Sequence, residues 1–423
     1  MECLLQNGMV YHEGSLSRAD ILLRDGRIVA IAPSLPADVM GEVLDLQGLY
    51  VFPGLLDVHV HLREPGFSYK ETIAGGTLAA AAGGFTTVCA MPNLDPVPDD
   101  LAHLRQELAL IEQDACVHVL PYGAITCGQR GEKLAELAEM APYVIAFSDD
   151  GHGVQDRGLM RSAMLAARAC GKMIVAHCEE NNLLRGGYIH DGAYARRHGH
   201  RGICAESEWR QLARDLDLVA ETGCRYHACH LSCRESVALL REAKRAGLDV
   251  SGETAPHYLV LSEDDLQEDG RFKMNPPLRG QADREALRQA VADGTIMIVA
   301  TDHAPHAAAE KACGLEKSAM GVVGLETAFP VLYSELVCGG LLSLPQLLAL
   351  LHDGPAQRFG IGSSLEAGAP ADLTVFDLAE TYRIDPACFQ GLGRATPFAG
   401  REVRGRCRLT MVGGRIVYQS EQQ

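Results

Sequence analysis

The chain has 423 residues, of which 47% are hydrophobic and 22% charged, and its formal net charge is -17 at pH 7. This composition is ordinary for a globular enzyme with a large core, whereas the negative charge argues against a nucleic-acid partner. No run of 18 apolar residues and no targeting segment is visible, and the 14 cysteines fall singly, so we expect a cytoplasmic protein with reduced thiols and no membrane span.

Both ends of the chain have a β-rich texture. Residues 1 to about 50 hold short alternating apolar segments with Asn-Gly and Asp-Gly pairs, which are typical of hairpins, and the last sixty residues repeat this pattern. The two ends could form unrelated caps. Because chain termini often lie close in space, we predict instead one small β-sandwich built from residues 1–52 and 360–423.

Residues 53–359 alternate short apolar runs with amphipathic stretches of about 10–15 residues, which indicates βα units and a parallel sheet. Eight such units predict a closed (β/α)8 TIM-type barrel rather than an open sheet. The apolar runs read GLLDVHVHL, FTTVCAMPN, CVHVLPYGAI, YVIAFSDDG, MIVAHCEE, RYHACHLS, DVSGETAPHYL and IMIVATDHAPH. We expect the glycine-rich spacer 181–207 to form a loop over one barrel face, and the segment 307–321 to be a mobile rim of the site.

Polar side chains end almost every one of these apolar runs. One histidine at a strand end is more often structural, but a barrel gathers the ends of several strands at its catalytic face. The run ends therefore indicate one shared site, and the residues concerned are His59, His61, Arg63, Asn93, Asp149, Asp150, His177, His227, His230, His257, Asn275, Asp302, His303 and His306.

The pair His59 and His61 predicts a metal site. Residues two apart on a strand point to the same side, so both imidazoles can reach one ion. Asp302, on the last strand, lies beside the first strand when the barrel closes, and can bind the same ion while an oxygen remains for proton transfer. These ligand types suit zinc, although cobalt and manganese can occupy similar sites.

A second ion would bind to His177 and His230, which follow two later strands. Two ions about 3.5–4 Å apart need a bridging anion. A carboxylate from the fourth strand, Asp149 or Asp150, is placed to supply it.

Several longer motifs make the chain resemble the dihydroorotases of the long, class I bacterial type. The motifs are DVHVHLREPG at 57–66, AMPN at 90–93, FSDDG at 147–151, AHCE at 176–179, CHLS at 229–232, NPPLR at 275–279 and TDHAPH at 301–306. The resemblance implies reversible, zinc-dependent cyclisation of N-carbamoyl-L-aspartate to (S)-dihydroorotate in pyrimidine (UMP) biosynthesis. It also implies a homodimer, and an association with aspartate transcarbamoylase is a further possibility.

The resemblance assigns metal roles residue by residue. His59, His61 and Asp302 match the ligands of the first of two zinc ions, and Asp302 also matches the catalytic acid/base. His177 and His230 match the ligands of the second. Many relatives bridge the ions with a carboxylated lysine, but this fourth strand has none. We therefore choose Asp150 as the bridge, with Asp149 as the alternative.

The resemblance also assigns substrate contacts. Arg63, Asn93 and His306 match the residues that hold the substrate carboxylate, and His61 is expected to contact the substrate as well as the metal. Asn275 and the backbone at Met320 and Gly321 match contacts to the pyrimidine ring. The family usually has an aromatic residue where this chain has Met320, which leaves a backbone contact unaffected.

Two other classes of protein remain as alternatives. Allantoinases and hydantoinases share the barrel and the histidine pair, but Arg63 within REPG, Asn93 and NPPLR favour dihydroorotase. A non-catalytic scaffold of the same superfamily would show substitutions among the metal ligands, and every ligand position is filled here.

Overall fold

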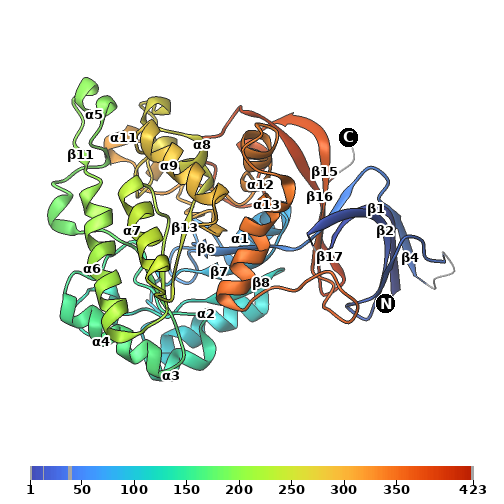
Figure 1. Ribbon diagram of the computed structural model, residues 1–423, viewed down its shortest axis with the longest axis horizontal. Helices are drawn as coiled ribbons and strands as arrows, with labels where there is room; N and C mark the ends of the chain where they lie inside the picture. Colours follow the sequence, from blue (N-terminus) through green and yellow to red (C-terminus); the bar gives the residue numbers. More distant parts are fainter. Residues whose placement is uncertain (1, 13, 37–40, 421–423) are drawn as a thin grey trace.

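The computed structural model describes residues 2–12, 14–36 and 41–420. A barrel of parallel strands surrounded by helices forms the larger part, and a sheet that contains both ends of the chain stands at one side of it (Figure 1). Within the described residues, no helix is both long enough and apolar enough to cross a membrane.

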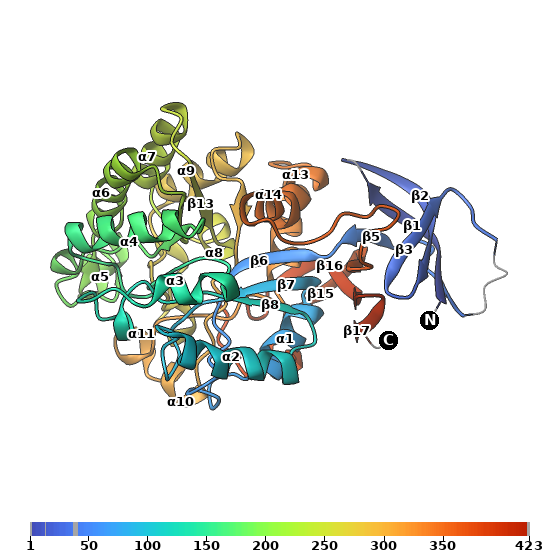
Figure 2. The same cartoon turned by 90° about the horizontal axis from the view of Figure 1, so that it is seen from below.

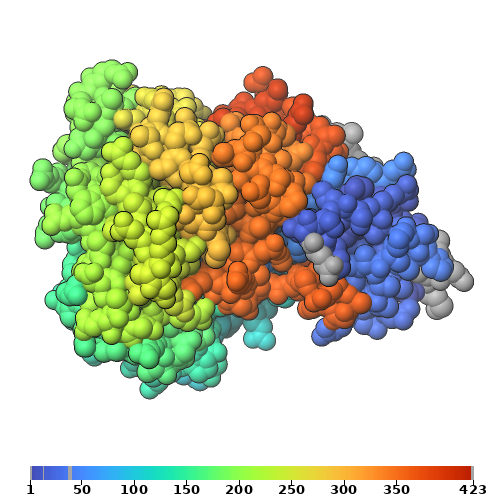
Figure 3. Space-filling view, viewed as in Figure 1, coloured from blue at the N-terminus to red at the C-terminus, as the bar shows by residue number. Residues whose placement is uncertain are grey.

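The sheet at the side of the barrel has eight strands, in the order β17-β16-β15-β5-β1-β2-β3, with β4 pairing to β1. The two ends of the chain meet where β15 runs antiparallel to β5. The expected joining of both ends in one β-rich unit is therefore confirmed, and Figure 3 shows the N-terminal segment packed beside the C-terminal one. The strands are β1 Glu2–His12, β2 Ser15–Arg24, β3 Arg27–Ala32, β4 Glu42–Asp45, β5 Tyr50–Pro53, β15 Leu373–Arg383, β16 Glu402–Val412 and β17 Arg415–Gln419.

The barrel strands form two parallel sheets, β6-β7-β8 and β14-β13-β12-β9. All residues of β6, β7 and β13 are buried, because one face meets the barrel interior and the other meets helices. Figure 2 shows β6, β7 and β8 side by side, with α1 and α2 nearby. The strands are β6 Leu55–Val60, β7 Phe85–Ala90, β8 His118–Pro121, β9 Ile174–Ala176, β12 Tyr226–Ala228, β13 Val250–Thr254 and β14 Ile298–Val299.

Single parallel bridges close the barrel between these two sheets. Phe147 bridges to Gly123 on one side and to Ile174 on the other, while Val60 bridges to His303. The expected fourth strand, 143–151, is therefore reduced to a short paired stretch around Phe147, but it occupies the fourth strand position. The (β/α)8 barrel is confirmed with this local difference.

Helices surround the barrel, and several of them begin at side-chain caps. Thr72 accepts a hydrogen bond from Gly75 N at the start of α1, and Asp100 accepts one from His103 N at the start of α2. The helices are α1 Ile73–Ala82, α2 Leu101–Asp114, α3 Leu137–Met140, α4 Arg157–Ala169, α5 Ala193–His198, α6 Glu206–Thr222, α7 Arg234–Arg245, α8 Pro256–Val260, α9 Gln281–Ala292, α10 Ala308–Lys311, α11 Gly314–Lys317, α12 Ala328–Leu332, α13 Leu344–Leu348 and α14 Gly354–Phe359.

Three segments differ from the expected elements. The seventh strand ends at Thr254, because Pro256 starts α8, where its missing N–H is no loss. The spacer 181–207 holds α5 and a two-stranded sheet of β10 Ile189–His190 and β11 Gly202–Ile203. The segment 307–321 holds α10 and α11, and buries Leu315 and Lys311, so it is anchored more firmly than its small residues suggested.

Candidate active site

The first two histidines lie at the end of β6, where the strand is irregular. The register between β6 and β7 shifts between Asp57 and Val60. The carboxylate of Asp57 accepts the backbone N–H of His59 at 3.0 Å, and so replaces a partner from the neighbouring strand. This bulge aims the imidazoles of His59 and His61 at the same space, with ring centroids 5.4 Å apart.

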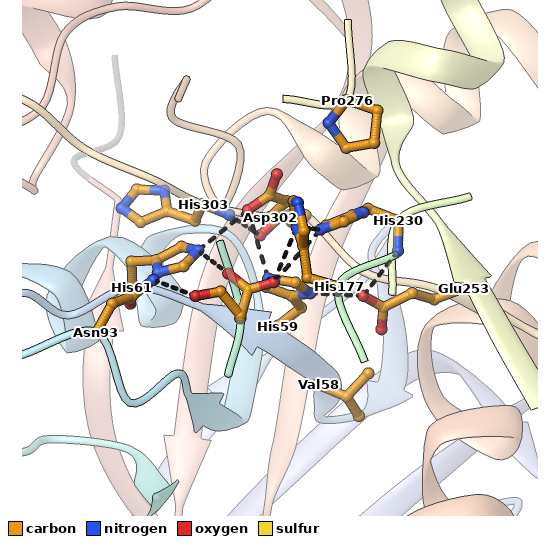
Figure 4. Close-up of polar contacts among 12 residues, drawn as sticks. Val58, His59, His61, Asn93, His177, His230, Glu253, Pro276, Asp302 and His303 are labelled. Atoms are coloured by element: carbon orange, nitrogen blue, oxygen red, sulfur yellow. Dashed lines mark hydrogen bonds and ion pairs between the residues drawn. The ribbon is translucent and has the colours of Figure 1, made fainter. Parts of the chain in front are cut away.

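Four imidazoles and two carboxylates converge at the mouth of the barrel (Figure 4). Asp150 Oδ1 lies 3.3 Å from His59 Nε2, 3.3 Å from His230 Nε2 and 3.6 Å from His177 Nδ1. Its other oxygen, Oδ2, lies 3.4 Å from His61 Nε2. Asp150 therefore stands between the two histidine pairs, as a bridging ligand would.

Asp302 completes this cluster from the far side. Its Oδ1 lies 3.2 Å from His61 Nε2 and 3.5 Å from His59 Nε2. The structure thus brings together all six residues expected to bind metal.

The cluster fits a metal centre by two independent observations. Ligand atoms about 2.0–2.1 Å from a tetrahedral zinc ion lie roughly 3.3–3.4 Å apart, and the spacings above match that geometry. In addition, His59 Nε2 and Asp150 Oδ1 are buried without a hydrogen-bond partner among the described residues. Buried polar atoms rarely stay unpaired, and cations between these atoms would satisfy both.

The neighbouring carboxylate, Asp149, faces a different part of the protein. It accepts hydrogen bonds from Ile125 N at 2.8 Å, from Thr126 N at 3.1 Å and from the Thr126 hydroxyl. Burial raises its pKa to about 6, although these hydrogen bonds oppose the shift. Asp149 therefore holds the loop after β8, and of the two aspartates only Asp150 reaches the imidazoles.

Glu253, on β13, lies beneath the cluster and orients His59. Glu253 Oε1 accepts the Nδ1–H of His59 at 2.6 Å, and its Oε2 accepts the Nε2–H of His227 at 3.0 Å. Burial alone would raise the pKa of Glu253, but the two facing imidazoles bring it below its ordinary value. A carboxylate behind a ligating histidine fixes the ring and its tautomer, so Nε2 is the atom that His59 presents to a metal.

Two asparagines also help to orient side chains of the cluster, one directly and one through a carboxylate. Asn93 Oδ1 accepts the Nδ1–H of His61 at 2.6 Å, while Asn93 Nδ2 donates to the carbonyl of Asp150. Asn275 Nδ2 donates to Glu179 Oε1 at 3.0 Å, and Glu179 Oε2 lies 3.5 Å from His177 Nε2. Both asparagines line the pocket, and the Oδ1 of Asn275 remains a buried acceptor without a partner among the described residues.

A cavity of about 230 Å³ opens above the cluster, large enough for a small cyclic metabolite. Of the residues assigned a metal or substrate role, only His59 is absent from its lining, because it lies deeper. The lining residues are His61, Arg63, Asn93, Asp150, Gly151, His177, His230, Asn275, Asp302, Ala304, His306, Met320 and Gly321.

Three of the lining residues other than glycine have a backbone conformation that favours glycine. The φ angles are 64° at Arg63, 33° at His230 and 48° at Asp302. Such conformations cost of the order of 1–3 kcal/mol each and concentrate at functional sites. The fold therefore tolerates strain at these positions in order to aim the side chains.

Arg63 is a buried cation without an anionic partner in the described chain. Its Nε donates to the carbonyl of Pro305 at 3.2 Å, and its terminal nitrogen lies 3.5 Å from His306 Nε2. Burial lowers its pKa to about 10, so it stays charged at neutral pH. No carboxylate of the described residues comes within 4.0 Å of this guanidinium, which leaves it available for an anion in the pocket.

The backbone at Met320 and Gly321 is held by internal hydrogen bonds. Met320 O accepts the Nε2–H of His306 at 2.8 Å, and Gly321 N donates to Lys273 O at 3.1 Å. Lys311 Nζ, whose pKa is lowered to about 7 by burial, donates to Gly321 O at 2.6 Å. A ring that contacts these backbone groups would have to share or exchange those bonds.

Two other histidines at expected strand ends stay outside the cluster. His257 lies in α8, where burial lowers its pKa to about 4. His303 accepts hydrogen bonds through Nδ1 from Gly324 N and Leu325 N, as expected for a residue that points away from Asp302.

Two carboxylates that support the ligands were missed from the sequence. Glu253 could have been identified from the sequence, because a charged residue inside the fully buried strand VSGET needs a partner. Glu179 also follows a strand, within AHCEE, but the sequence does not show which way its side chain points.

Comparisons with known proteins identify the fold and the family of the chain. Residues 226–418 match the family described as "Amidohydrolase family", and residues 48–236 match the one described as "Dihydro-orotase-like". The solved L-hydantoinase (dihydropyrimidinase) from Arthrobacter aurescens is 27% identical, with a TM-score of 0.88 over 99% of this chain and 96% of that chain. Fold and site together define a cyclic amide hydrolase of the metal-dependent amidohydrolase superfamily.

Relatives with higher sequence identity show which family of this superfamily the chain belongs to. Two proteins named dihydroorotase, from Bacillus cytotoxicus and Bacillus cereus, are each 48% identical over 100% of this chain and 99% of their own length. The chain belongs to the dihydroorotase family.

Proposed function

We propose that this enzyme is a dihydroorotase that uses two zinc ions per subunit to interconvert N-carbamoyl-L-aspartate and (S)-dihydroorotate, in pyrimidine biosynthesis. The observation that carries the proposal is Arg63, a buried guanidinium with no carboxylate partner among the described residues, beside a cluster that fits two metal ions. A buried cation without a partner is costly, and dihydroorotate supplies a carboxylate next to its cyclic amide. Hydantoin and allantoin lack such a carboxylate.

The chain's own residues bind and orient this substrate. Arg63 can hold the carboxylate through two parallel N–H···O bonds, which sets orientation as well as charge. Asn275 Oδ1 has no hydrogen-bond partner among the described residues, and can accept a ring N–H. Bound metal ions would supply Lewis acidity, which lowers the pKa of water and polarises a carbonyl.

Asp302 is placed to move the proton. In ring opening, its carboxylate takes a proton from the attacking water and gives it to the ring nitrogen as the C–N bond breaks. In ring closure the same proton travels back, and water leaves as the C–N bond forms. Asp302→Asn keeps an oxygen near His61 but cannot carry the proton, so both directions should slow together.

One assay separates dihydroorotase from its relatives. Purified protein is given dihydroorotate, allantoin and hydantoin in parallel, and its metal content is measured by mass spectrometry. We expect dihydroorotate alone to open efficiently, with two zinc ions per chain. Opening of hydantoin or allantoin in preference to dihydroorotate would overturn the proposal, and protein that turns over none of them would favour the scaffold alternative.

The homodimer, the location in the cytoplasm and the complex with aspartate transcarbamoylase are proposals that rest on the family resemblance. Sedimentation of the purified protein, alone and with aspartate transcarbamoylase, tests the two assemblies. A monomer, or two independent boundaries in the mixture, would contradict them.

A further inference from the structure

Lys70 lies behind the pocket, in the loop between β6 and α1, and none of the roles above uses it. Its ammonium Nζ is 3.2 Å from His306 Nδ1 and 3.0 Å from Glu310 Oε1. The rings of Phe67 and Tyr69 flank it, at 5.5 Å and 5.6 Å from Nζ. The side chain is only 14% exposed, so the ammonium is held in place rather than free in solvent.

This contact determines which nitrogen of His306 carries a proton. An ammonium group only donates hydrogen bonds, so Nδ1 must accept and must be unprotonated. The proton of the neutral ring is then on Nε2, which donates to Met320 O at 2.8 Å. Nε2 also lies 3.5 Å from the guanidinium of Arg63, so a substrate carboxylate held by Arg63 would share this N–H with the carbonyl of Met320.

Glu310 would favour the opposite arrangement. Its Oε2 is 3.5 Å from His306 Nδ1, near enough to attract a proton to that nitrogen. Met320 O favours a proton on Nε2 and Glu310 favours one on Nδ1, so removal of the Lys70 ammonium should move the balance between the two tautomers toward Nδ1. In the Nδ1 tautomer, the lone pair of Nε2 would lie against Met320 O and beside Arg63, and would repel a carboxylate held by Arg63.

We propose that Lys70 is a positioning residue for substrate binding, which favours the Nε2-protonated form of His306, so that Nε2 presents an N–H rather than a lone pair where Arg63 would hold the substrate carboxylate. The tautomer follows from the contacts alone, whereas the consequence for binding rests on the proposed function.

The direct test is the protonation pattern of His306 in the zinc-loaded protein. Nitrogen-15 NMR at pH 8, with the His306 signal assigned from the His306→Gln spectrum, distinguishes the two ring nitrogens without any substrate. In the unmodified protein we expect the proton on Nε2, and in Lys70→Met a shift toward Nδ1. An unchanged Nε2–H in Lys70→Met would overturn the proposal.

Kinetics test the consequence of that shift. Lys70→Met should raise the KM for dihydroorotate at least tenfold and leave kcat within about threefold, because the metal ligands are untouched. Lys70→Arg, which still donates toward Nδ1, should recover part of the loss. A tautomer shift without a change in KM would show that His306 does not face the carboxylate, and would also overturn the proposal.

A second substitution separates tautomer from charge. In Lys70→Met/Glu310→Gln the anion that attracts the proton to Nδ1 is removed, so part of the affinity should return although the cation is still missing. The exposed Lys317 of α11 is the matched control, and Lys317→Met should leave KM unchanged. If KM rose equally in Lys70→Met and Lys317→Met, or if KM did not recover in the double variant, the effect of Lys70 would be a general attraction of charge, and the proposal would be wrong.

The pH dependence of the single variant gives a further check. Burial, with the cations Arg63 and Lys70, lowers the pKa of His306 to about 3, and the charged groups that face the ring are Arg63, Lys70, Glu310 and Lys311. Without Lys70 this pKa should rise, so at pH 6 an imidazolium with both protons forms. The KM of Lys70→Met should therefore approach the unmodified value at pH 6. If the ratio of the two KM values were the same at pH 6 and pH 8, this result would contradict the proposal.

Absence of dihydroorotate turnover by the unmodified protein would instead overturn the proposed function, and would leave the NMR result standing.

Discussion

His59 donates its Nδ1–H to Glu253 across 2.6 Å, and so turns its Nε2 toward Asp150. The acceptor lies on β13 and the donor on β6, so the contact exists only once the barrel has closed. It links the orientation of a proposed metal ligand to a carboxylate at the floor of the site.

This contact predicts that Glu253→Gln weakens metal binding. The amide group cannot accept from both His59 and His227, so the His59 ring loses its fixed orientation. We expect zinc affinity to fall about 10- to 100-fold, as is usual for such supporting groups. Competition with a chelating dye measures this directly. Ser251→Ala is the control, because it removes only the far partner of His227, 2.7 Å from Nδ1, and an equal loss there would contradict a specific role for Glu253.

The two adjacent aspartates should behave differently. Asp150→Ala should lower the metal content and abolish activity, because two cations would lose their shared anion. Asp149→Asn should retain zinc and instead lose about 1–3 kcal/mol of stability, since its loop contacts with Thr126 and Ile125 are weakened. Metal analysis and thermal unfolding of both variants separate these outcomes. Full zinc in Asp150→Ala together with metal loss in Asp149→Asn would reverse the assignment of the bridge.

Arg63→Lys should reduce binding although the charge is kept. A compact ammonium cannot reproduce the two-pronged contact of a planar guanidinium with a carboxylate. We expect kcat/KM for dihydroorotate to fall at least tenfold, which corresponds to about 1.4 kcal/mol. Arg130→Lys, at an exposed position, is the control. Equal kcat/KM in the Arg63 variant and the unmodified enzyme would remove Arg63 from the site.

A pH effect on stability is expected at Glu326, which accepts the backbone N–H groups of Gln390 and Gly391. Burial raises the pKa of this carboxyl to about 7. The folded protein therefore binds more protons than the unfolded chain between about pH 4.5 and 7, and stability from this group is lost as the pH rises through 7.

Glu326→Gln removes that titration. The difference in the free energy of unfolding between the variant and the unmodified protein should be about 1–3 kcal/mol more favourable to the variant at pH 8 than at pH 5. Unfolding in urea at the two pH values measures the change, with the exposed Glu112→Gln as the control. A difference between variant and unmodified protein that stays the same at both pH values would show that Glu326 is ionised throughout.

The sequence by itself determined the barrel, the joined ends and the set of polar residues at the strand ends. Local patterns carry this information, because strand alternation places His59 and His61 on one side and apolar runs mark the strands. The fourth strand was harder to define, since only a short stretch around Phe147 pairs with its neighbours.

Only the tertiary structure decided which of two adjacent carboxylates, Asp149 or Asp150, faces the imidazoles, because both lie in one short turn and their directions depend on loop packing. The same holds for Glu253 and Lys70, whose partners are 194 and 236 residues away in the chain. Hydrogen bonds between distant segments set the orientation and tautomer of a side chain, and these follow from the closed barrel rather than from local residue patterns.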